Sequence, residues 1–387
     1  MREDWDYKQL GDIGKVSMCK RIYKKQTSST GDIPFYKIGT FGKEPDAFIS
    51  KDLYKEYRSK YSFPNKGDIL ISASGTIGRR VVYNGEPAYF QDSNIVWISN
   101  DETEVLNEYL YAFYGYCDWS PSKGATISRL YNDDLRKTKI PIPPLPEQKR
   151  IVVILEEVFE AIDKAKANVE RNIENAEELF QSKLEEVFKQ LSEQDKITYQ
   201  LKDVCEYDKI TNEKVGIPYV GLADIESDSG RFIGDLSPRE MKSRTFYFNE
   251  NHLLYGRLRP YLNKILVSDF EGHCSTEIFP IKTSNLISKS FLFYWFLKPT
   301  TVNKIDKTST GARMPRANMD DVMNFEIPVP SIEVQKELVD QLIKIKENSL
   351  EISQLYKYKK VQLEELKKSI LQKAFSGELT ANEHVAA

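Results

Sequence analysis

Arginine and lysine residues stand among glycines and tyrosines at several places in this 387-residue sequence. In the segment SGTIGRR (74–80), two arginines follow glycines, whose conformational freedom lets a backbone approach phosphate closely. The segment YGRLRPYLNK (255–264) interleaves three cationic side chains with two tyrosines. Arginine can bind guanine through two hydrogen bonds, whereas lysine and backbone amides bind phosphate. The candidate nucleic-acid-contacting residues are Arg79, Arg80, Lys123, Arg129, Arg257, Arg259, Lys264, Arg313 and Arg316.

Each of these residues also has a purely structural interpretation. A surface arginine is most often solvated or paired with a neighbouring carboxylate. Arg129 and Arg316 occupy matched positions shortly before the predicted start of a long helix, where they could brace the fold instead of contacting a ligand. The sequence leaves both interpretations open.

The motifs of several common enzyme sites are absent from the sequence. The glycines of residues 74–80 do not belong to a nucleotide-binding GxxxxGK[ST] loop. No Asn/Asp-Pro-Pro-aromatic motif for amino-methyl transfer occurs, and Pro45–Asp46 is not followed by the Asp/Glu-x-Lys of a nuclease site. The three histidines lack metal-ligand spacing, and the four cysteines form no CxxC pair. We therefore predict no catalytic, cofactor-binding or metal-binding residues.

The distribution of charge is more informative than the net charge of −3. Residues 1–140 carry a net charge of +2 and residues 141–196 carry −5, whereas residues 197–327 and 328–387 are each neutral. Because neither half is strongly basic, any attraction for DNA phosphates must come from local patches or from partner proteins. The scattered cysteines, and the lack of a long apolar run, favour a cytoplasmic protein with no membrane partner.

One passage of the sequence occurs twice. Residues 124–152 align without a gap with residues 311–339 at a constant offset of 187, and a long helical pattern follows each copy. Two copies at this spacing indicate a duplicated unit of domain plus helix rather than a solenoid. Such a duplication favours pseudo-two-fold symmetry, which suits a symmetric partner such as double-stranded DNA. The identical pairs include Arg129/Arg316, Asp133/Asp320, Asp134/Asp321 and Gln148/Gln335.

Each copy leads into a stripe of apolar residues at three- and four-residue steps. The pattern predicts two long amphipathic helices, which we interpret as structural and as each other's antiparallel partner. Pro146 suits the first turn of the first helix, and Ser331 suits the N-cap of the second. The predicted stripes are Ile151, Leu155, Val158, Ile162, Ala165, Val169, Ile173, Ala176 and Leu179, and Leu338, Leu342, Ile345, Ser349, Ile352, Tyr356, Leu363, Leu366 and Ile370.

The remaining segments alternate short apolar runs with turn residues. Runs at 33–39, 67–75, 79–85 and 94–99 predict strands, and residues 104–116 have helical spacing. The second half restarts near Thr198, where residues 198–204 are similar to residues 7–13. The predicted fold class is α+β, with two mixed, largely β globular domains joined by two long antiparallel coiled-coil helices. The predicted segments are domain 1–140, helix 141–196, domain 197–327 and helix 328–387.

These features together resemble the specificity subunits of type I restriction-modification systems. IPIPPLPEQKRIV (140–152) and IPVPSIEVQKELV (327–339) carry the resemblance most firmly. GDILISASGTIGR (67–79), LLYGRLRPYLNK (253–264) and LKKSILQKAFSGEL (366–379) are also similar to that family. The order and duplication of these segments, which cover nearly the whole chain, make the resemblance specific.

The resemblance implies a function in DNA recognition without catalysis by this chain. Each globular domain would be a target-recognition domain that reads one half of a bipartite sequence in double-stranded DNA. The two helices would set the spacing and dock two methyltransferase (modification) subunits, and restriction subunits with ATP-driven endonuclease activity could join that complex. No cofactor is implied for this chain itself.

Two other function classes are compatible with the composition. A non-enzymatic coiled-coil adaptor could use the paired domains to bind proteins, although the duplication and the arginine-bearing glycine loops favour DNA. An enzyme with an unfamiliar site is the weaker alternative, because no catalytic constellation is present.

Overall fold

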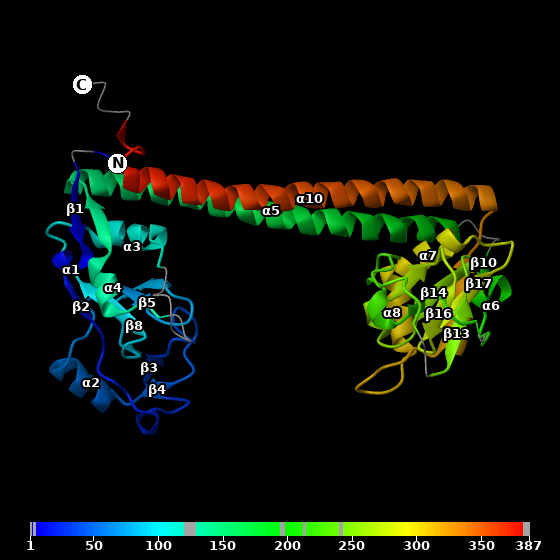
Figure 1. Cartoon of the computed structure of the whole chain (residues 1–387), viewed down its shortest axis with the longest axis horizontal. Helices are drawn as coiled ribbons and strands as arrows, with labels where there is room; N and C mark the ends of the chain where they lie inside the picture. Colours follow the sequence, from blue (N-terminus) through cyan, green and yellow to red (C-terminus); the bar gives the residue numbers. More distant parts are fainter. Residues whose placement is uncertain are drawn as a thin grey trace. The chain divides into compact units, whose positions relative to one another are not determined.

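The computed structural model of the chain describes residues 2, 5–119, 129–193, 198–211, 214–239 and 243–381. The chain divides into two units, Met1–Asn168 with Lys359–Ala387, and Val169–Tyr358. Each unit contains one globular body together with part of each of the two long helices, α5 (Leu145–Glu193) and α10 (Ile332–Ser376) (Figure 1).

The body of the first unit combines short strands with four further described helices of one turn or more. Its strands are β1 (Asp6–Gln9), β2 (Lys15–Ser17), β3 (Ile33–Tyr36), β4 (Phe48–Ile49), β5 (Ile69–Ser72), β6 (Arg80–Val82), β7 (Tyr89–Phe90), β8 (Ile95–Ser99) and β9 (Lys139–Ile142). Its helices are α1 (Leu10–Ile13), α2 (Lys51–Lys60), α3 (Asn107–Tyr116) and α4 (Asn132–Lys137), with a 3₁₀ turn at Lys24–Gln26. The predicted strands and the predicted helix within 104–116 are confirmed.

The body of the second unit is built in the same way. Its strands are β10 (Thr198–Gln200), β11 (Cys205–Tyr207), β12 (Tyr219–Val220), β13 (Thr245–Phe248), β14 (His252–Gly256), β15 (Ile265–Val267), β16 (Gly272–Ser275), β17 (Ile278–Thr283) and β18 (Glu326–Pro328). Its helices are α6 (Leu201–Val204), α7 (Lys289–Leu297), α8 (Pro299–Lys307) and α9 (Met319–Val322), with 3₁₀ turns at Leu222–Asp224 and Pro260–Leu262.

The two bodies share a sheet topology despite their divergent sequences. An antiparallel four-stranded sheet has the order β2-β8-β5-β6 in the first body and β11-β17-β14-β15 in the second. Antiparallel ribbons join β1 to β9 and β10 to β18. The small third sheets differ, because β4 pairs with β3 in the order β4-β3-β7 whereas β13 pairs with β16 in the order β12-β16-β13. The duplicated plan is therefore kept near the helices and altered at the outer sheet.

The central strand of each four-stranded sheet is buried on both faces. Ile69 and Ile71 pack in the core that includes α3 and both long helices, whereas Leu70 packs in a second core beneath the small sheet. In the second body, Leu253 and Leu254 divide between two cores in the same way. A strand covered on both sides needs apolar residues at every position, which explains the uninterrupted apolar runs.

The two long helices run antiparallel where they pack together within each unit. In the first unit, Lys166 of α5 forms an ion pair with Glu364 of α10, and Asp163 pairs with Lys367 at 3.3 Å. In the second unit, the Ser349 hydroxyl donates a hydrogen bond to the Ala176 carbonyl. The predicted antiparallel pairing is confirmed in both units. The predicted N-cap is also consistent with the structure, because the Ser331 Oγ accepts a hydrogen bond from Val334 N at 3.5 Å.

Three positions of the predicted apolar stripes are wrong. Leu179 is 57% exposed while Phe180 is buried, because from this point α5 also packs against α7, where Phe180 meets Tyr294. On α10, Ile352 is exposed and the neighbouring Ser353 is buried. A small polar residue therefore occupies the buried position, and a search for apolar residues misses it. Leu366 is exposed as well.

A buried glutamine fixes each long helix to the globular body at its start. Gln148 donates hydrogen bonds to the carbonyls of Glu104 and Pro143 and accepts one from Leu106 N, at 2.7–2.9 Å. Gln335 makes the same three bonds, donating to Leu286 and Pro330 and accepting from Ser288 N, each at 2.8 Å. Both side chains are fully buried. The duplicated glutamine therefore joins the helix to the residues that precede α3 or α7.

Replacing Gln335 with alanine is expected to destabilise the second unit by about 1–3 kcal/mol. The change leaves the buried Pro330 carbonyl without its partner, which costs about that amount. It also removes the partners of the partly buried Leu286 carbonyl and Ser288 amide. Hydrogen exchange of the α7 amides measures the loss of protection. The matched control is the exposed neighbour Lys336→Ala, which should leave exchange unchanged. Wild-type protection of α7 in the Gln335→Ala protein would contradict the proposed anchoring role.

Among the described residues, none of the helices combines the length and apolarity needed to cross a membrane.

Candidate nucleic-acid interface

In the second body, the loop that follows β14 is held on both sides by backbone hydrogen bonds. Arg257 N donates to the Glu277 carbonyl at 2.9 Å, and Ala317 N donates to the Arg257 carbonyl at 2.9 Å. Arg259 N donates to the Pro315 carbonyl at 2.7 Å. The loop is thus clasped between the start of β17 and the duplicated segment that contains Arg316. We call residues 257–264 with Glu277 and residues 315–317 the second clasp.

Two of the predicted arginines meet at one carboxylate in the second clasp. Arg257 Nε lies 2.9 Å from Glu277 Oε2, and Arg316 donates to Glu277 Oε1 through both Nε and Nη2, each at 2.9 Å. The Arg257 guanidinium also lies 5.4 Å from the centre of the Phe279 ring. All three charged side chains remain partly exposed, Glu277 least at 23%. The cluster has an excess of one positive charge and a fixed geometry.

The second clasp contains two left-handed residues that are not glycine. Arg259 has φ +52° and Asn263 has φ +40°. Asn263 is fully buried and donates to Asp228 Oδ1 at 2.9 Å, so its conformation is held by the fold. Arg259 is exposed. Such a conformation costs a residue with a side chain about 1–2 kcal/mol, and it holds the Arg259 side chain at the surface.

The first body contains an equivalent clasp, formed by residues 73–79 with Asn94 and residues 129–130. Ala73 N donates to the Asn94 carbonyl at 2.7 Å, and Leu130 N donates to the Ala73 carbonyl at 2.9 Å. Ser74 forms a β-bridge with Arg129, as Leu258 does with Arg316. These two bonds and the bridge match those that join Arg257 to Glu277 and Ala317, and Leu258 to Arg316, in the second clasp.

The side chains at matched positions of the two clasps differ. Asn94 stands where the second clasp has Glu277, and it accepts a hydrogen bond from the Ser74 hydroxyl at 2.9 Å. Gly75, with φ +66°, stands where the second has Arg259. Arg129 donates to the Ser93 carbonyl at 2.7 Å rather than to a carboxylate. The two clasps are one backbone frame with two sets of side chains.

The other predicted residues lie in varied surroundings. Arg79 Nη1 donates to the Phe41 carbonyl at 2.8 Å, and Lys264 Nζ donates to the Ile225 carbonyl at 2.6 Å. Arg80 stacks on Tyr111 of α3, with 4.4 Å from the guanidinium carbon to the ring centre. Arg313 is exposed. Lys123 falls outside the described residues.

A polar concavity of about 570 Å³ adjoins the first clasp. Asn94 and Ser93 form part of its wall, and Arg21 and Lys37 also line it, paired with Asp92 at 2.7 Å and Asp46 at 2.8 Å. Neither this concavity nor Glu277 was predicted, because the residues that meet there come from segments far apart in the chain with no shared motif.

The four cysteines are unpaired thiols. Burial raises the pKa of Cys19, Cys117 and Cys205 to about 12 and also raises that of Cys274, so all four remain protonated at neutral pH. Across the part of the chain that the structure describes, no group of three or more His, Cys, Asp and Glu side chains is arranged to bind a metal ion.

Proteins of similar sequence carry a consistent description. A putative type I restriction enzyme specificity subunit of Haemophilus influenzae is 68% identical over 154 residues, which are 40% of this chain and 40% of that protein. The EcoDI specificity subunit of Escherichia coli is 30% identical over 41% of this chain and 35% of its own length. These two matches therefore span well under half of the relatives. The putative MjaX specificity subunit of Methanocaldococcus jannaschii is 22% identical over 97% of this chain and 94% of its own.

Solved structures share the fold at low sequence identity. A chain from a study of assembly and conformational transition in a type I restriction-modification system has a TM-score of 0.72 at 17% identity, covering 97% of this chain and 98% of that chain. The HsdS subunit of Thermoanaerobacter tengcongensis has a TM-score of 0.60 at 18% identity, covering 98% of each. The family model for the type I restriction modification DNA specificity domain matches residues 2–174 and 183–367. With both halves of the duplication inside that match, this chain belongs to the type I restriction modification DNA specificity family.

Proposed function

We propose that this chain is the sequence-recognition subunit of a type I restriction-modification complex and has no catalytic role of its own. Residues 1–140 and 197–327 each read one half of a bipartite sequence in double-stranded DNA. Residues 141–196 and 328–387 set the distance between the halves and dock two methyltransferase subunits. Methylation and, where restriction subunits join, cleavage belong to those partners. The adaptor alternative has no comparable support, because the matching family is one of DNA specificity domains.

The observation that carries this proposal is the pair of clasps. A recognition protein needs a rigid frame that presents different side chains to different sequences, and base contacts rather than phosphate contacts carry the specificity. In the first body, backbone hydrogen bonds join Ala73 to Asn94 and to Leu130. In the second body, the same two bonds join Arg257 to Glu277 and to Ala317. Their side chains differ in charge and in hydrogen-bonding groups. An enzyme site duplicated in this way would keep its reactive groups instead.

We assign DNA contact in the second body to Arg257, Arg259 and Arg316, with Arg313 and Lys264 beside them. The arginine pair at Glu277 is positioned in advance, so its guanidinium groups lose little freedom on binding. The left-handed Arg259 fits the same role, because strained residues with exposed side chains concentrate at functional sites.

In the first body, we assign contact to the first clasp together with the neighbouring concavity. Arg79 and Arg129 carry the charge there, and Ser74 and Asn94 offer hydrogen-bonding groups that can reach base edges. Lys123, just before the clasp segment in sequence, is kept as a further candidate. Arg80 stacks on Tyr111 and lines a separate cavity beside α3.

The proposal is tested by measuring DNA binding with and without the methyltransferase subunit. Alone, the chain should bind DNA with micromolar affinity and little specificity, because neither body has the basic excess of a protein that binds DNA unaided. With the methyltransferase subunit, binding should reach the nanomolar range of specific complexes and depend on one sequence. A methyltransferase complex that binds and methylates all sequences equally would contradict the proposed function.

Replacing Glu277 with glutamine is expected to increase nonspecific DNA binding by the complex and to weaken discrimination in one half of the target. The change removes the carboxylate that neutralises one of two arginines, which frees one more cation for phosphate. The slope of log K against log salt should therefore steepen by about one. Glu271→Gln is the matched control, since Glu271 pairs with Lys214 at 2.6 Å in the same body. An unchanged salt dependence would exclude Glu277 from the interface.

A further inference from the structure

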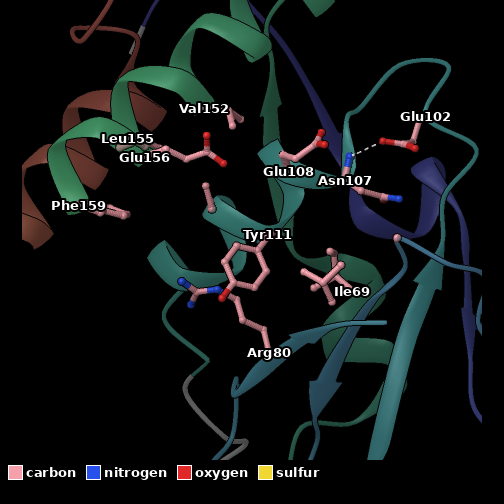
Figure 2. A pocket seen from close by; sticks show the side chains of 13 residues that line it. Ile69, Arg80, Glu102, Asn107, Glu108, Tyr111, Val152, Leu155, Glu156 and Phe159 are labelled. Atoms are coloured by element: carbon pink, nitrogen blue, oxygen red, sulfur yellow. Dashed lines mark hydrogen bonds between the residues drawn. The ribbon is translucent and has the colours of Figure 1, made fainter. Parts of the chain in front are cut away.

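A cavity of about 330 Å³ lies in the first unit between α3, the β5–β6 edge of the sheet and the first turns of α5. Figure 2 shows side chains from α3, from β6 and from α5 pointing toward this space. Its residues are not those of the first clasp, and the role in DNA recognition proposed above leaves it unexplained. Its lining residues are Gly67, Ile69, Arg80, Val82, Glu102, Asn107, Glu108, Tyr111, Ala112, Val152, Leu155, Glu156 and Phe159.

The cavity combines an apolar floor with an acidic rim. Leu155 and Phe159 of α5 face Ile69 and Ala112 across the floor. Three carboxylates line it against one guanidinium, Arg80, so the lining has an excess of two negative charges. Figure 2 shows Glu108 on α3 and Glu156 on α5, the two helices that flank the cavity. An apolar group with a positive charge beside it complements this surface.

Two of the three carboxylates can contact a positively charged ligand, whereas the third is used within the protein. Glu102 accepts a hydrogen bond from Asn107 N at 2.9 Å and caps the start of α3. Glu108 and Glu156 are exposed. Arg80 is held against Tyr111, which keeps the guanidinium along one wall.

Two matched positions in the second unit have different side chains. Ala112 is the sixth residue of α3, and the sixth residue of α7 is Tyr294, which is buried. Phe159 corresponds to Lys346 at the offset of 187. The Lys346 ammonium lies 5.6 Å from the centre of the Phe293 ring and donates to the Ser229 carbonyl at 3.3 Å. At these two positions the second unit therefore has a buried tyrosine and a lysine, where the first unit has an alanine and a phenylalanine.

We propose that the cavity of the first unit is an anchor site for a methyltransferase subunit, which inserts one aliphatic or aromatic side chain flanked by lysine or arginine. The inference rests on the proposed function, which supplies this partner, and on the charge and shape of the cavity. Because the second unit has Tyr294 and Lys346 in place of Ala112 and Phe159, only one of the two docked methyltransferase subunits gains this anchor. The two docking sites therefore differ in affinity.

The test uses the full chain co-expressed with its methyltransferase subunit, and native mass spectrometry measures the two binding steps. Ala112→Tyr fills the cavity with the residue that the second unit has at the matched position. The affinity of one methyltransferase subunit should fall about tenfold, the effect of losing one buried anchor, while the affinity of the other is unchanged. The Glu108→Gln/Glu156→Gln double variant should lower the same affinity, and this loss should shrink at high salt. Glu157→Gln, an exposed neighbour on α5 outside the cavity, is the control.

The outcomes separate this inference from the function on which it rests. Wild-type affinities at both steps in the Ala112→Tyr and the double variant would overturn the anchor site and leave the proposed function intact. Equal losses at both steps would also overturn it, because the cavity belongs to one unit. The double variant keeps the test valid if Ala112→Tyr misfolds, since both glutamates are exposed. A wild-type chain that takes up no methyltransferase subunit would instead contradict the proposed function.

Discussion

Replacing residues 5–142 with the corresponding body of a related chain is expected to change one half of the methylated sequence completely. The other half and the gap between the halves should stay the same. The exchange removes the first clasp and its concavity but retains Gln148 and both long helices. The cut after Ile142 keeps β9 with its partner β1, whose ribbon a cut at residue 140 would interrupt. Single-molecule sequencing of methylated DNA measures the outcome.

The exchange requires that the incoming body fit the helix ends that it meets. Phe375 of α10 packs against Tyr109 and Phe113 of α3, with ring centres 5.3 Å apart in both pairs. A donor body with aromatic residues at these two positions preserves that contact. The reciprocal exchange of residues 198–328 should change only the opposite half of the sequence. A single exchange that altered both halves would show that recognition is shared between the bodies.

Replacing Leu155 with aspartate is expected to unfold the first unit. Leu155 is 2% exposed and packs in the core that joins α5 and α10 to α3. A buried charge without a partner costs about 3–5 kcal/mol, a large part of the stability of a typical domain. Hydrogen exchange in β5 and α3 should increase toward the unfolded rate, and methylation should be lost.

Val153 provides the control for this experiment. It lies two residues away on α5 and is 52% exposed, so Val153→Asp places the same charge in water. The Val153→Asp protein should retain wild-type exchange in β5 and α3. If Leu155→Asp also retained it, the packing of α5 against the first body would be wrong.

The elements were predictable where the residue pattern has one physical cause. A strand covered on both faces must be apolar throughout, and Ile69, Leu70 and Ile71 show that run directly. The helix pairing followed from two similar stripes that need partners. The prediction failed at Leu179 because a third element, α7, packs against α5 there. It failed at Ile352 because the buried residue between the two long helices is a serine. The spacing of apolar residues shows neither the third element nor the buried serine.

The candidate interface was predictable only in part. Arg257 and Arg316 stood out as cations near glycine, but their meeting at Glu277 depends on residues 20 and 39 positions apart. Gln335 was visible as one of the identical residues of the duplication. Its function as an anchor was not, because its partners Leu286 and Ser288 contribute only backbone atoms. Because every residue type has a backbone carbonyl, and all but proline a backbone amide, the sequence does not reveal such partners.

We propose that the two bodies of this chain read the two halves of one DNA target. The most direct measurement is single-molecule sequencing of DNA from cells that express this chain with its methyltransferase subunit. We expect methylation at one bipartite sequence, with two short specific halves separated by a nonspecific gap of constant length, and only when this chain is present. Methylation at a single undivided sequence, or methylation that persists without this chain, would show that the two bodies do not read two half-sites.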